Sequence, residues 1–143
     1  MYSTAHLAMG LVLGKITGDY PLAIIASLAL DADHLIVHAK NKNLFNIKKI
    51  WKSAHQSEDS GRTWFHSVYA LVLIPAIALF WGKEAAFIIF TSMLGHYFLD
   101  ILDDSDFWPL YPSKRFNMKG FIGYFSLAEL GFTAALVLAW FLL

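Results

Sequence analysis

The chain contains no cysteine, little charge and no net charge. Its 143 residues include 11 Lys and Arg, 11 Asp and Glu, and six His. Without cysteine there can be no disulfide, no thiolate metal site and no thiol nucleophile. Because basic and acidic residues balance, no excess positive charge is available to attract nucleic acid, and we expect no nucleic-acid partner. Any transition-metal chemistry must therefore rely largely on histidines.

Apolar residues are abundant instead. They make up 57% of the chain and charged residues only 15%, whereas soluble domains average about 45–50% and about 25%. A small domain surrounded by water needs much of its surface polar, and this composition does not provide it. We therefore predict a single membrane-embedded domain over residues 1–143, built as an all-α bundle and surrounded by membrane lipids.

The first apolar stretch, residues 4–30, permits two interpretations. A single long span would place Lys15 near the middle of the bilayer, at a cost of about 2.5–3.5 kcal/mol or more. A hairpin of two short helices, Ala5–Ile16 and Pro21–Leu30, would instead turn near Gly18. Helices of that length are too short to cross about 30 Å of hydrocarbon, so the pair would be re-entrant or packed against other helices. We favour the hairpin because glycine and proline mark turns.

Three later apolar runs predict three spanning helices, at His66–Trp81, Ala85–Leu102 and Phe121–Leu143. Two polar stretches separate them from their neighbours. The stretch 38–65 is a basic loop that lies in the cytoplasm or at the membrane surface, and 103–120 is a second polar loop. Placing both loops in the cytoplasm leaves nine of the eleven basic residues there, as the positive-inside rule favours. We therefore predict a multi-pass protein of the inner (plasma) membrane.

Polar residues occur where these apolar segments begin or end. If residues 4–30 form a hairpin, they all collect at the cytoplasmic end of the bundle, whereas a single span would leave His6 on the opposite side. The residues that we expect to act as metal ligands are His6, Asp31, His34, His66, His96 and Asp100.

The spacing of these residues suits a metal site. His96 and Asp100 are four residues apart and share one face of a helix, and Asp31 and His34 are three apart. Histidine and carboxylate ligands without sulfur suit zinc, manganese or iron in an open site that retains water. We expect one to three ions, zinc above all, that activate water for hydrolysis.

Two further residues are candidates for catalysis, Asp33 and Arg62. Either Asp31 or Asp33 completes the ligand shell. The other could act as a general base or orient a ligand histidine by accepting a hydrogen bond from its second nitrogen. Arg62 lies one turn before His66 and could bind a substrate phosphate; a solvated loop residue is the alternative.

Taken in order, these motifs resemble a known family. They are His6, Asp31-Ala32-Asp33-His34, Arg62-Thr-Trp-Phe-His66-Ser67, His96-x-x-x-Asp100 and Leu110-Tyr111-Pro112. The set is similar to the inner-membrane metal-dependent hydrolases, which include LexA-regulated bacterial members. Leu30 departs from the family pattern, which usually has proline there, and residues 103–106 differ from the expected Thr and Gly. More distantly, the order is similar to zinc phospholipase C and P1 nuclease, which implies a phospholipid or another phosphoester as substrate.

Other functions fit the same residues. Histidine and aspartate inside a membrane also mark the paths of protons and cations, so a small transporter or ion-handling protein is one alternative. A non-catalytic membrane protein with a structural metal is another. The sequence does not distinguish a monomer from an oligomer.

Overall fold

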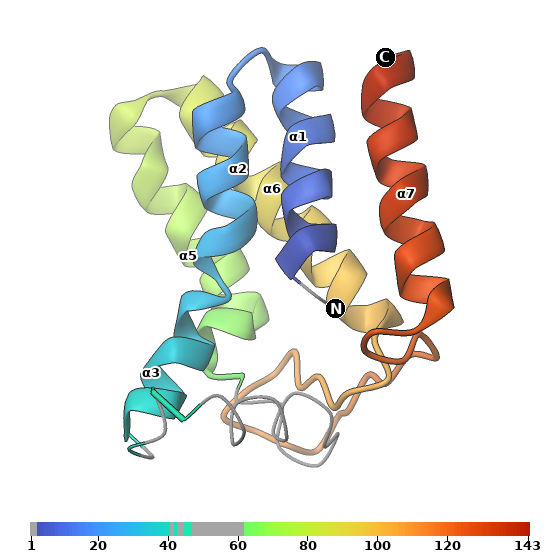
Figure 1. The fold of residues 1–143 in the computed structure, drawn as a ribbon. Helices are drawn as coiled ribbons and strands as arrows, with labels where there is room; N and C mark the ends of the chain where they lie inside the picture. Colours follow the sequence, from blue (N-terminus) through green and yellow to red (C-terminus); the bar gives the residue numbers. More distant parts are fainter. Residues whose placement is uncertain (1–2, 41, 43–44, 47–61) are drawn as a thin grey trace.

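The computed structural model describes residues 3–40, 42, 45–46 and 62–143 (Figure 1). The described chain is helical, as predicted. Most of the predicted basic loop 38–65 lies outside the described residues. The helices are α1 (Ser3–Thr17), α2 (Tyr20–Ala29), α3 (Ala32–Lys40), α5 (Val68–Ala78), α6 (Lys83–Leu102) and α7 (Leu127–Leu142), with short 3-10 turns η1 (Trp64–His66) and η2 (Leu79–Trp81).

The first two helices form the predicted hairpin. Gly18 adopts a positive φ of 81° in the turn, and the Asp19 side chain caps α2 by accepting a hydrogen bond from the backbone N–H of Leu22 at 3.0 Å. The helices then run side by side (Figure 1), so close that a Cβ on Gly10 would lie 3.0 Å from the Cα of Ile24. With 15 and 10 residues, neither helix has the roughly 20 residues of a membrane span. The hairpin places His6 at the same end of the bundle as the end of α2.

Helix α6 contacts α1, α2 and α5 and forms the centre of the bundle. Within the described part of the chain it is the one helix long and apolar enough to cross a membrane, with 20 residues. The apolar segment Val68–Trp81 and helix α7 are shorter. The prediction of three spanning helices is therefore not confirmed, and one candidate span is found.

Helix α7 starts six residues later than predicted because its beginning is capped. The Ser126 side chain accepts a hydrogen bond from the backbone N–H of Glu129 at 3.1 Å. The Glu129 carboxylate in turn accepts one from the backbone N–H of Phe125 at 2.7 Å. Ser126 is thus the N-cap, and Glu129 holds the residue before it, one position earlier than in a standard capping box; α7 has 16 residues.

The segment after α6 folds back against the end of the bundle. Its backbone pairs Asp103 with Ile122 and Phe107 with Met118. Phe107 is buried in the main apolar core, where its ring packs edge-on against Tyr97. The predicted polar loop 103–120 is therefore an ordered cover at the end of the bundle where α2 ends and α6 ends (Figure 1).

Candidate metal centre

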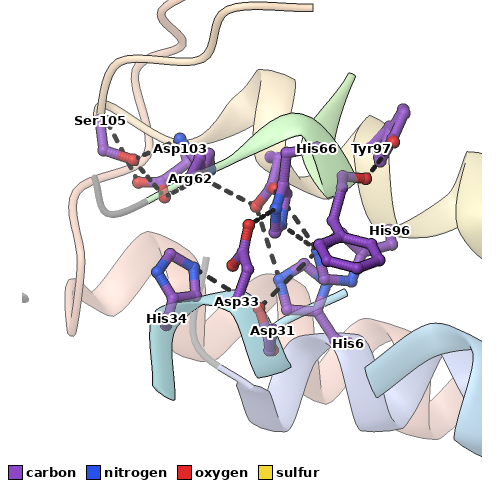
Figure 2. A network of polar contacts seen from close by, with 12 residues as sticks. His6, Asp31, Asp33, His34, Arg62, His66, His96, Tyr97, Asp103 and Ser105 are labelled. Carbon is purple, nitrogen blue, oxygen red and sulfur yellow. Dashed lines mark hydrogen bonds and ion pairs between the residues drawn. The ribbon is translucent and has the colours of Figure 1, made fainter. Parts of the chain in front are cut away.

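The structure brings all six predicted metal ligands together at one end of the bundle, and Figure 2 labels His6, Asp31, His34, His66 and His96. Four of them are buried, and Asp31 and His34 are partly exposed. They come from α1, from the junction of α2 and α3, from η1 and from α6. Two groups have ligand atoms close enough to hold an ion: His6, His96 and Asp100, and Asp31, His34 and His66.

Three donor atoms form a compact triangle at the centre of this cluster. Nε2 of His66 lies 3.1 Å from Nε2 of His96, and each of these nitrogens lies 3.4 Å from Oδ2 of Asp100. Ligands about 2.0–2.1 Å from a tetrahedral zinc ion lie about 3.3 Å from each other. The triangle therefore has the dimensions of one face of a zinc site.

The second nitrogen of each central imidazole is already engaged. His66 donates from Nδ1 to the Asp33 carboxylate at 2.8 Å, and His96 donates from Nδ1 to the backbone carbonyl of Ser27 at 2.6 Å. Both partners can only accept, so Nδ1 carries the proton in each ring and Nε2 of the neutral ring carries a lone pair. If both rings are neutral, two lone pairs and a carboxylate face one another and repel, so either a proton or a metal ion must lie between them.

Asp33 orients His66 and is itself held in place. Its Oδ2 also accepts hydrogen bonds from the backbone N–H and the hydroxyl of Thr63, at 2.8 and 3.0 Å. Burial opposes ionisation of this carboxyl, but the hydrogen bond from His66 and the one from Thr63 outweigh it and lower the pKa of Asp33. Of the two roles that the sequence left open for the aspartates, Asp33 has the geometry that orients a ligand.

His6 adds a second set of donors beside the triangle. Its ring stacks on His96, with the centroids 3.8 Å apart and 14° between the planes, and its Nε2 lies 3.6 Å from Oδ1 of Asp100. His6 is fully buried, yet neither ring nitrogen has a hydrogen-bond partner among the residues that the structure describes. An unsatisfied buried imidazole is costly, and a bound ion would remove that cost.

Asp31 and His34 form the open side of the cluster. Oδ1 of Asp31 lies 3.7 Å from Nε2 of His96 and 3.8 Å from Nε2 of His34, while Oδ2 accepts a hydrogen bond from the Ser3 hydroxyl at 3.1 Å. The side chains of Asp31 and His34 are 19% and 33% exposed. Solvent or a substrate can therefore reach the donors from the α3 side.

Arg62 contacts Asp100 on the side away from His66 and His96. It is buried, which excludes the alternative that it is a solvated loop residue. Its Nη2 donates to Oδ1 of Asp100 at 2.9 Å and to Oδ2 of Asp103 at 3.2 Å, and its Nη1 donates to Ser105 and to the backbone of Asp106. Burial opposes the charge, but Asp100 and Asp103 outweigh it and raise the pKa of Arg62. Binding of a substrate phosphate by Arg62 stays a prediction; in this structure both terminal nitrogens hold the protein's own oxygens.

Several supporting residues were missed by the sequence analysis. Thr63 lies three residues before His66 and caps η1. A threonine just before a helical turn is a recognisable cap, so this residue could have been predicted. The hydroxyl of Tyr97 lies 2.6 Å from the Phe65 carbonyl and 2.8 Å from that of Ser67, and it ties α6 to the turn that carries His66. Ser27 contributes its backbone carbonyl, and this role could not be predicted because it does not depend on the type of side chain.

Comparison with known proteins places the chain in the membrane. Residues 1–143 match the family model described as YdjM inner membrane protein. No curated protein and no solved structure matches the chain.

Proposed function

Because the chain belongs to the YdjM inner membrane protein family, we propose that it is a membrane-bound metal-dependent hydrolase that acts on a phospholipid or another phosphoester at the membrane surface. The observation that carries this proposal is the triangle of donor atoms from His66, His96 and Asp100, with edges of 3.1–3.4 Å. These nitrogen and oxygen donors suit zinc first, and manganese or iron next.

The proposal assigns one task to each part of the cluster. His66, His96 and Asp100 would hold the first ion, with Asp31 at its open side. His6 and Oδ1 of Asp100, which lie 3.6 Å apart, extend the donor set and would hold a second ion. A divalent metal bound there acts as a Lewis acid toward water and toward a phosphoryl oxygen.

The protein's own residues would prepare that chemistry. Asp33 and the Ser27 carbonyl fix both imidazoles with Nε2 toward the ion. Arg62 fixes Oδ1 of Asp100 and leaves Oδ2 directed toward the two histidines. Burial keeps bulk water away from these donors, while the partly exposed Asp31 and His34 leave one side open. An open side is what distinguishes catalytic from structural zinc sites.

The position of the cluster favours a hydrolase over a transporter. Transporters usually bind their substrate near the middle of the bilayer, between repeated halves. Here the donors lie at one end of the bundle, beside the ordered cover formed by residues 103–120 (Figure 1). That position suits a substrate whose polar part lies at the membrane surface, and the basic loops predict that this surface is the cytoplasmic one.

The test is a comparison of metal content and hydrolysis in purified protein. The wild-type protein in detergent is stripped with chelator, reloaded with zinc, manganese or iron, and assayed against phospholipids and a chromogenic phosphodiester. Asp100→Asn removes one ligand charge and should lose both bound metal and hydrolysis. Asp19→Asn is the matched control, since asparagine caps a helix as well as aspartate and Asp19 lies at the opposite end of the bundle.

Each alternative function has its own outcome. Stoichiometric metal without hydrolysis of any phosphoester would indicate a structural metal. Uptake of a cation into vesicles, lost in Asp100→Asn and unaccompanied by hydrolysis, would indicate an ion-handling protein. Equal metal content in the two variants would overturn the assignment of the site itself.

A further inference from the structure

A narrow apolar groove runs along the bundle beside the metal centre. It lies between α2, α5 and α6 and has a volume of about 220 Å³. Its lining side chains are all apolar, and they include Leu22, Ala29, Leu30, Phe65, Ile89 and Met93. Such a lining offers no hydrogen bond to a polar ligand, so the groove suits a hydrocarbon.

One end of the groove adjoins the donor cluster. Leu30 directly precedes Asp31, and Phe65 directly precedes His66. Ile89 lies seven residues before His96 on α6, which is about 10 Å along a helix axis. The groove therefore extends from residues next to the candidate metal centre along α2 and α6, toward Leu22 in the first turn of α2.

The volume of the groove limits what it can hold. An apolar cavity of about 150 Å³ holds benzene, and pockets for whole drug-sized ligands measure about 300–1,000 Å³. At about 220 Å³ the groove takes part of one alkyl chain and neither two chains nor a polar headgroup. Its rim includes Ile25, which is 64% exposed, so a chain can enter from the side of the bundle.

We infer that this groove binds one hydrocarbon chain of a membrane lipid whose polar headgroup lies at the His/Asp cluster. The inference rests on the proposed function. It adds that the protein recognises the substrate by one of its hydrocarbon chains as well as by its headgroup. A lipid in a bilayer has its headgroup at the surface and its chains along the helices of its neighbours. The groove and the cluster have this same relation, since the groove is lined at one end by the residues directly before Asp31 and His66 and otherwise follows the helices.

The experiment uses a phospholipid with a photoactivatable group in one acyl chain. Wild-type protein in vesicles of that lipid is irradiated, and the labelled peptides are mapped by mass spectrometry. Ala29→Trp adds an indole at an exposed position that lines the groove, while Ala134→Trp makes the same change at an exposed position of α7, a helix whose main contact is with α1. Metal content is measured on the same samples.

We expect labels on the α2 and α6 peptides that line the groove. Ala29→Trp should lower this labelling by about tenfold, because an indole displaces two or more buried methylene groups, and Ala134→Trp should leave it unchanged. Labelling spread over all helices alike, or unaffected by Ala29→Trp, would overturn the inference, as would cross-links from the groove to a second copy of the chain. Failure of the proposed function appears separately, as absence of metal from the wild-type protein, whatever the lipid labels show.

Discussion

At the scale of single residues, the central observation is that the Nε2 atoms of two buried histidines face each other. Nε2 of His66 and Nε2 of His96 lie 3.1 Å apart, and each ring is held by an acceptor on its other nitrogen. Two neutral imidazoles in this arrangement direct acceptors at a buried carboxylate, which is unfavourable without a cation between them. The proposed metal ion, shared with Asp100, would explain why all three donors converge.

The first prediction concerns the acceptor behind His66. Asp33→Asn retains an oxygen that can accept from Nδ1 of His66 but removes its negative charge, so the imidazole becomes a weaker ligand. Loss of such a partner typically lowers metal affinity by about 10- to 100-fold. Competition titration against a chromophoric zinc chelator measures this change. Unchanged affinity would show that Asp33 does not support a ligand.

The second prediction concerns Arg62, which pairs with Asp100 and Asp103. Arg62→Ala leaves two buried carboxylates without their shared cation, and removing one partner of a buried pair costs about 3–5 kcal/mol of folding free energy. Arg62→Lys keeps the charge but loses the planar fork that contacts both acids, and it should restore part of the stability. Thermal unfolding of the metal-free protein in detergent measures both variants. Equal melting temperatures for wild type and Arg62→Ala would contradict the ion pairing described here.

At the scale of helices, the close approach of α1 and α2 positions His6 over His96. Gly10 and Gly14 make that approach possible. A Cβ on Gly14 would lie 2.8 Å from the Cα of Tyr20, and one on Gly10 would lie 3.0 Å from the backbone of α2. Any side chain at Gly14 must therefore push the two helices apart.

The third prediction contrasts two glycine substitutions. Gly14→Ala should destabilise the protein by about 1–3 kcal/mol, as overpacking usually does, and should weaken metal binding by displacing His6. Gly131→Ala, in α7, meets no atom within 4 Å and should stabilise the helix by about 1 kcal/mol. Melting temperatures in detergent should move in opposite directions. A shift of the same sign in both variants would show that the α1–α2 contact is not as close as described.

The hairpin could be predicted from sequence, whereas the lengths of the other helices could not. Gly18 and the proline after it marked the turn because a positive φ and a helix start depend on local residue type. The start of α7 depends instead on whether Ser126 and Glu129 cap the helix. An apolar run in the sequence does not reveal where such a cap lies. The predicted run from Phe121 was therefore six residues too long at its beginning.

At the scale of the whole molecule, the clustering of the candidate ligands was easier to predict than the membrane topology. The ligand residues stand at the ends of apolar segments, where polar side chains are conspicuous, and a hairpin brings those ends together. One oxygen of Asp100 faces His96 and the other faces Arg62. This orientation depends on packing between segments far apart in the chain, so it could not be predicted from the sequence. The number of spans also depends on how short helices pack around α6.

The most direct test of the whole account is X-ray absorption spectroscopy at the zinc edge on zinc-loaded wild-type protein. The account predicts at least one ion per chain, nitrogen and oxygen ligands at about 2.0–2.1 Å, the outer-shell scattering of two or more imidazoles, and no sulfur. Asp100→Asn should lose this signature while Asp19→Asn keeps it. A wild-type protein that retains no zinc, or that binds it without imidazole scattering, would contradict the central claim that these histidines and aspartates form a metal centre.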